Sequence, residues 1–144
     1  MTNETDPALD QSLDLYVKAA LEKKTLNLIV LDVHNLSSVA DVFIICSGRS
    51  NRQVTAIAEF IKVELKKQKI QPLSSEGIKE GLWALLDYGH VIIHVFYEPV
   101  RDFYDLEGLW ADAKRIKTKS LRDLEKMMEE NMGMESPEME SFVE

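Results

Sequence analysis

Apolar and polar positions along the chain predict an ordered series of helices and strands. Apolar residues at helical spacing predict an amphipathic helix over residues 10–24, with Asp10 as its cap. The runs 26–33 and 41–46 are nearly continuously apolar, which is typical of strands covered on both faces. Ser50 followed by Gln53 is a capping box, so a second amphipathic helix should begin there.

The next stretch predicts a β-hairpin, around which the rest of the domain is organised. Two apolar runs of strand length flank the short segment 87–90, which contains a glycine. If Tyr88 and Gly89 are the two loop residues, Asp87 pairs with His90 across the hairpin.

The two faces of this hairpin differ in character because side chains alternate along a strand. One face is wholly apolar and should lie on the core. The other face carries Trp83, Leu85 and Asp87 together with two histidines. Apolar bulk with a charged rim is typical of a surface that binds a partner. The alternative is that another element of the same chain covers this face.

The remainder of the chain predicts short helices and a charged extension. Pro99 fits the first position of a helix over residues 100–104, and Phe103 and Trp110 are expected to be core aromatics. We expect a flexible tail at 1–8, one domain at 9–113, and a charged extension at 114–144 that is disordered from Glu129 onward. The predicted fold class is α+β or mixed α/β, with helices packed on a single mixed sheet.

Composition limits the function. The chain has 144 residues, a net charge of −8 and one cysteine. This charge argues against non-specific binding to nucleic acid or anionic lipid, but it permits a basic protein partner. No apolar run is long enough to span a bilayer, and the N-terminal residues lack the features of a signal or transit peptide. We therefore expect a cytoplasmic protein.

Candidate catalytic chemistry is sparse. The segment Ser47-Gly48-Arg49-Ser50 has the shape of an anion-binding corner, and nucleotidyltransferases place such a turn beside paired carboxylates that hold Mg²⁺. Here Asp41 and Asp87 each stand alone, so a capped helix after a tight turn is the better interpretation. Cys46 lies within an apolar strand and is expected to be a core residue. We expect neither a bound metal nor a cofactor.

Several motifs in a fixed order carry a resemblance to a known family. They are Ala40-Asp41-Val42-Phe43-Ile44-Ile45-Cys46-Ser47-Gly48, Ser50-x-Arg52-Gln53-Val54, Glu76-Gly77, Trp83-x-Leu85-x-Asp87-Tyr88-Gly89, His94-x-Phe96 and Arg101-x-Phe103-Tyr104-x-Leu106-Glu107-x-Leu109-Trp110. With these motifs, residues 9–113 resemble the ribosomal silencing factor family, whose members are also called Iojap-like proteins.

The resemblance implies a sheet similar to a nucleotidyltransferase core without its catalytic carboxylates. It also implies a translational repressor that binds the large ribosomal subunit through a protein of the intersubunit face, number fourteen, and blocks joining of the small subunit. The contact residues would be Trp83, Leu85, Asp87 and Tyr88. Self-association as a homodimer is possible, and contact with RNA is at most peripheral. The alternatives are a nucleotidyl-transferring enzyme that uses the segment 47–50, and an oligomeric scaffold without a ribosomal role.

Overall fold

The computed structural model describes the backbone of residues 7–143 and the side chains of residues 8–132. The helices are α1 (Pro7–Leu21), α2 (Asn51–Lys67), α3 (Glu98–Tyr104), α4 (Leu106–Leu109) and α5 (Lys119–Val143). The strands are β1 (Leu26–Asp32), β2 (Val42–Gly48), β3 (Ser74–Glu76), β4 (Trp83–Asp87), β5 (Val91–Tyr97) and β6 (Lys114–Arg115). Residues 1–6, which make up most of the expected flexible tail, lie outside the described residues.

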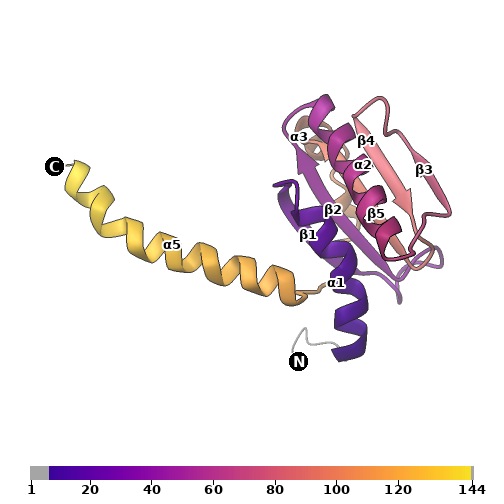
Figure 1. Ribbon diagram of the computed structural model, residues 1–144, viewed down its shortest axis with the longest axis horizontal. Coiled ribbons are helices and arrows are strands. Elements are labelled where there is room, and N and C mark those ends of the chain that lie inside the picture. Colours follow the sequence, from indigo (N-terminus) through magenta and orange to yellow (C-terminus); the bar gives the residue numbers. More distant parts are fainter. Residues whose placement is uncertain (1–6, 144) are drawn as a thin grey trace.

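All six strands form one mixed sheet, which confirms the predicted fold class. The strand order is β3-β4-β5-β2-β1-β6, and α1 and α2 lie side by side on one face (Figure 1). The central strands β2 and β5 pair in parallel, whereas the other neighbouring strands are antiparallel. The centre of the sheet is buried on both faces, which explains why the sequence of β2 is almost continuously apolar.

Each face of the sheet has its own core. On the face that α1 and α2 cover, Ile57 and Ile61 of α2 pack with Ile44 and Ile93 of the central strands. On the opposite face, the aromatic and aliphatic side chains of β2 and β5 form a second and smaller core with Val100, Leu106 and Trp110. The chain is thus a three-layered domain in which the third layer, formed by α3 and α4, is small.

The start of α2 has the predicted cap. Ser50 has an extended backbone and its Oγ accepts a hydrogen bond from the backbone N–H of Gln53, at 3.1 Å. The Gln53 side chain reaches back and accepts from the N–H of Arg49, at 2.5 Å. The first contact satisfies a backbone donor that the first turn of a helix leaves free, and the second satisfies the N–H of the residue before the cap.

The hairpin forms as predicted, but its register differs. The pairs are Trp83 with Phe96, Leu85 with His94 and Asp87 with Ile92, so each residue pairs two positions further along β5 than expected. The reason is the position of glycine. Gly89 has φ of 93° and stands first in a two-residue loop with His90, where a type II′ turn favours glycine. A shift of two residues leaves every side chain on its predicted face.

The chain after Ala113 contributes to the domain, although the sequence analysis assigned it to a charged extension. β6 adds a sixth strand through the pairs Leu31 with Arg115 and Asp32 with Lys114. Ile116 and Leu121 join the core beneath α1. The helical backbone of α5 continues to Val143, and the disorder expected from Glu129 onward stays a prediction.

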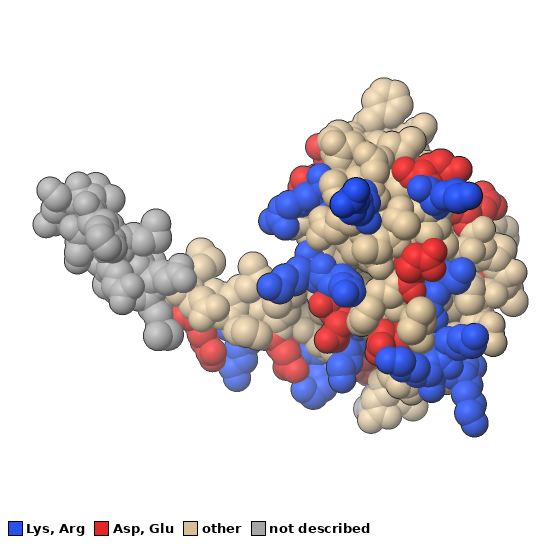
Figure 2. Space-filling view, turned by 45° about the horizontal axis from the view of Figure 1, so that its top comes forward, with Lys and Arg blue, Asp and Glu red and all other residues tan. Residues whose placement is uncertain are grey.

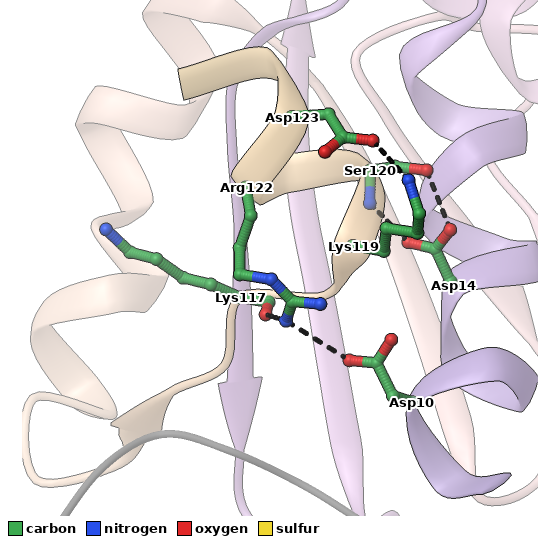
Figure 3. Close-up of polar contacts among 7 residues, drawn as sticks. All are labelled: Asp10, Asp14, Lys117, Lys119, Ser120, Arg122 and Asp123. Atoms are coloured by element: carbon green, nitrogen blue, oxygen red, sulfur yellow. Dashed lines mark hydrogen bonds and ion pairs between the residues drawn. The ribbon is translucent and has the colours of Figure 1, made fainter. Parts of the chain in front are cut away.

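Polar contacts fix the first turn of α5 to α1. The Asp14 carboxylate accepts from the backbone N–H of Ser120 at 3.0 Å and from its Oγ at 2.7 Å (Figure 3). Arg122 Nη1 donates to the backbone oxygen of Lys117 at 2.6 Å and lies 3.5 Å from Asp10. Asp14 therefore acts as an N-terminal cap supplied by another helix, and later turns of α5 extend away from the sheet (Figure 1).

Candidate protein-binding site

Three of the four predicted contact residues lie together on β4. Trp83, Leu85 and Asp87 alternate with the buried residues Ala84 and Leu86, and each of the three is half-buried. We call their side of the hairpin, which also carries Ile92, His94 and Phe96, the tryptophan face. α3 and α4 cover the part of this face nearest the centre of the sheet and leave Trp83 and Leu85 at its margin. The alternative of cover by the same chain therefore holds for the central part, and a partner-binding role for the margin stays a prediction.

Trp83 is held in position by aromatic neighbours. Its ring packs on Phe96, with centroids 4.7 Å apart, and on Tyr104, at 5.1 Å. Its indole N–H donates to Nδ1 of His94 over 3.1 Å. Because this N–H already has a partner within the chain, the exposed part of Trp83 presents mainly apolar ring surface, as interface anchors commonly do.

Asp87 stabilises the turn as well as carrying the only negative charge on β4. Its Oδ1 accepts a hydrogen bond from the backbone N–H of Gly89, at 2.8 Å, in an Asx-type turn. Among the described residues no basic side chain forms an ion pair with it. The carboxylate therefore remains available to a basic group of a partner.

Tyr88, the fourth predicted contact residue, lies apart from the other three. Its ring is 7% exposed and packs edge-on against Tyr16 of α1, with centroids 5.3 Å apart, on the opposite side of the sheet. Burial and the neighbouring Tyr16 raise the pKa of Tyr88 to about 12. Tyr88 is thus placed to hold the hairpin turn against α1 rather than to extend the surface around Trp83.

A row of aromatic residues extends the tryptophan face beyond the predicted residues. Tyr104 contacts Trp83, and Phe103 contacts Tyr104 with ring centroids 5.1 Å apart. Phe103 is 81% exposed and Tyr104 52% exposed, so the expectation that Phe103 is a core aromatic is wrong. The prediction failed because α3 spans only seven residues and its buried side is taken by Arg101.

Arg101 fixes α3 to the sheet and to α4. Arg101 is 6% exposed, and its Nη2 lies 2.8 Å from the Glu107 carboxylate. Its Nη1 donates to Oγ of Ser47 at the end of β2, also at 2.8 Å. Glu107 thus neutralises this buried guanidinium. This contact orients the short helix that presents Phe103 and Tyr104.

The segment 47–50 is occupied by contacts within the chain. Ser47 accepts from Arg101, and Ser50 caps α2. Gly48 is closely packed, since a Cβ there would lie 3.1 Å from Val54. These contacts support the predicted capped helix, and the described residues contain no cluster of His, Cys, Asp or Glu that could hold a metal ion.

Cys46 is a core residue, as predicted. It is fully buried in the first core, and burial raises the pKa of its thiol to about 12. The thiolate that nucleophilic catalysis needs is therefore strongly disfavoured.

Charged side chains are interspersed over the surface. On the face drawn in Figure 2, groups of Lys and Arg side chains alternate with Asp and Glu side chains and with uncharged surface. That face lacks the continuous basic stripe that is typical of proteins that follow a nucleic-acid backbone. Among the described residues, no helix is both long and apolar enough to cross a membrane.

These features define a small α+β domain with an aromatic surface at one margin of its sheet, and sequence comparison places it in a family. The sequence model described as ribosomal silencing factor during starvation matches residues 6–141, and the chain belongs to this family. The match extends beyond the 9–113 of the expected resemblance. Members of the family are ribosome-associated regulators of translation, which confirms the class of function that the motifs predicted.

Individual relatives agree with this assignment. A ribosomal silencing factor of Bacillus subtilis is 42% identical over 101 residues, which cover 70% of this chain and 86% of that protein. The chloroplastic protein Iojap of Zea mays is 34% identical over 100 residues, covering 69% of this chain and 43% of the maize protein. A crystal structure of a Chromobacterium violaceum protein has a TM-score of 0.67 and 36% identity, and covers 74% of this chain and 88% of that chain.

Proposed function

We propose that this chain binds the large ribosomal subunit through the tryptophan face and prevents joining of the small subunit by its bulk. Membership of the ribosomal silencing factor family supports a ribosomal partner. The observation that supports this binding site is the row formed by Trp83, Tyr104 and Phe103, which offers preorganised aromatic surface at the open margin of the sheet. The partner of this row would be the intersubunit-face protein, number fourteen.

The roles of the four hairpin residues follow from their positions. Trp83 and Leu85 would supply the apolar centre of the contact, where a few residues commonly provide most of the binding energy. Asp87 would meet a basic side chain at the rim. Tyr88 would act indirectly, by holding the turn that presents Asp87. A specific interface needs roughly 800 Å² per partner, which a domain of this size can supply.

The mechanism needs only affinity and volume. A bound domain of 16.5 kDa on the intersubunit face would occupy space that the small subunit requires. No step of covalent chemistry is involved. Self-association through the same aromatic row would compete with ribosome binding, so the active species would be the monomer.

The test is co-sedimentation with purified large subunits, with and without small subunits. Trp83→Ala should lower the affinity for large subunits at least tenfold and restore subunit joining. Val63→Ala is a matched control, because Val63 is 54% exposed on α2, on the other side of the sheet. Circular dichroism should show that both variants are folded. If a folded Trp83→Ala variant binds and excludes as the wild type does, the proposed surface is wrong.

A further inference from the structure

The edge of the sheet farthest from β4 is only partly covered by β6. β6 pairs only with Leu31 and Asp32 of β1, so in the described part of the chain no strand lies beside the first half of β1, Leu26 to Ile29. An open strand edge presents backbone N–H and C=O groups that can pair with another chain. A β-bulge falls between Leu26 and Ile29, and Asn27 has φ of 50°. The bulge limits the open edge to a short segment, which would accept a few residues but not an extended sheet.

This edge forms the floor of a groove of about 690 Å³, here called the edge groove. One wall is mainly apolar and is formed by Leu21 at the end of α1 and by Leu121, Leu124 and Met128 of α5. Glu125 of α5 also lines this wall, where it pairs with Lys117. Leu121 belongs to the core beneath α1, so this wall rises on the α1 side of the sheet.

The opposite wall of the edge groove is acidic. It consists of Glu98, Asp102 and Glu107 of α3 and α4, which lie on the other side of the sheet. Arg101 pairs with Glu107. Among the described residues no ion pair neutralises Glu98 or Asp102. Of the two arginines that line the groove, Arg101 is paired and Arg115 forms no ion pair within the described part of the chain.

We propose that the edge groove binds an extended peptide segment in which basic and apolar residues alternate. A peptide that pairs with β1 directs successive side chains to opposite faces of the sheet. Apolar side chains would then contact Leu121, Leu124 and Met128, and basic side chains would reach Glu98 and Asp102. The partner is thus an unstructured segment of a basic protein.

This inference is independent of the proposed function. The edge groove lies at β1, and three strand boundaries separate β1 from β4 in the order of the sheet. A second attachment point would allow one partner to be held at β4 and another at β1. The two surfaces share α3, but Asp102 lines the edge groove whereas Phe103 and Tyr104 form the aromatic row, so the two proposals depend on different side chains and can fail separately.

The probe is a synthetic peptide, Lys-Val-Lys-Val-Lys with acetylated and amidated ends, titrated into the full-length protein and followed by NMR. The backbone amide signals of Leu26 to Ile29 should shift, and their hydrogen exchange should slow. Successive backbone N–H groups of a strand point to opposite edges, so only the valine N–H groups or only the lysine N–H groups can face β1. Of two peptides, one N-methylated at the valines and one at the lysines, one must therefore lose its pairing. One of these two N-methylated peptides should bind at least tenfold more weakly than the unmodified peptide.

A charge reversal tests the acidic wall. Asp102→Lys should weaken binding of the peptide at least fivefold, whereas Asp112→Lys should change it by less than twofold. Both aspartates are exposed, and Asp112 does not line the edge groove. The proposal is overturned if both N-methylated peptides bind like the parent, if the shifts fall outside the edge groove, or if the two charge reversals weaken binding equally.

Discussion

His94 is the residue whose protonation would most disturb the tryptophan face. It is 5% exposed, and its Nδ1 accepts from Trp83, so the ring proton of the neutral form resides on Nε2. Nε2 is buried without a partner among the described residues. Burial lowers the pKa of His94 from 6.5 to about 4, because nothing in its aromatic surroundings stabilises the charged ring.

Acidification should therefore destabilise the protein through His94. The unfolded chain takes up this proton near pH 6.5 and the folded chain only near 4, so stability falls as the pH drops through this interval and is unaffected above it. The linkage relation gives a loss of about 2 kcal/mol at pH 5. Urea unfolding at pH 7.5 and pH 5 should show this loss in the wild type and not in His94→Gln. Equal losses in both proteins would mean that other groups cause the pH dependence.

Asp87 allows the rim of the proposed interface to be tested without loss of the turn. Asp87→Asn removes the charge but keeps the Oδ1 acceptor for Gly89, so unfolding free energy should change by less than about 0.5 kcal/mol. Affinity for large subunits should fall at low salt, and the difference from the wild type should shrink as salt rises. Binding at two salt concentrations measures this. A loss that does not depend on salt would place Asp87 in a desolvated contact instead of at the rim.

At the scale of elements, the attachment of α5 depends on one carboxylate of α1. Asp14→Ala should cost about 1–2 kcal/mol, because the Ser120 N–H and Oγ lose their acceptor. Hydrogen exchange of the first turn of α5 should speed up accordingly. Asp123→Ala is the control, since its pair with Lys119 lies at the surface, where water screens it, and its loss should change stability much less than the loss of the cap. Equal effects of the two substitutions would contradict a capping role for Asp14.

The same scale shows where sequence patterns suffice and where they fail. Strands β1, β2, β4 and β5, the α2 cap and the two faces of the hairpin follow from local periodicity, and the structure confirms them. β6 was not predicted, because it lies in the segment expected to be a charged extension. The predicted hairpin register differs from the observed one because two loops, 88–89 and 89–90, fit the sequence pattern. Only the backbone conformation of Gly89 distinguishes them. Phe103 was placed in the core because helical spacing does not reveal which side of a short helix faces the sheet.

For the whole molecule, the arrangement of the sheet separates two surfaces of different chemistry. The aromatic row lies beside β4, and the edge groove lies beside β1. Local pattern indicated only the Trp83 end of the row, because Tyr104 and Phe103 come from another element, and it did not indicate the edge groove. The edge groove in particular requires α1, β1, α3, α4 and α5 at once, so only the tertiary structure defines it.

The length of α5 provides the last prediction. Removal of residues 132–144 should change neither the thermal midpoint nor subunit exclusion, because the contacts that hold α5 to the domain lie in its first turns, at Ser120 and Leu121. Removal of residues 117–144 should lower the midpoint by several degrees, since it deletes the buried Leu121 and leaves Asp14 without its partners. Thermal unfolding and co-sedimentation of both truncated proteins measure these effects. A large destabilisation by the shorter truncation would show that the end of α5 packs on the domain, and that the role assigned to its first turns is incomplete.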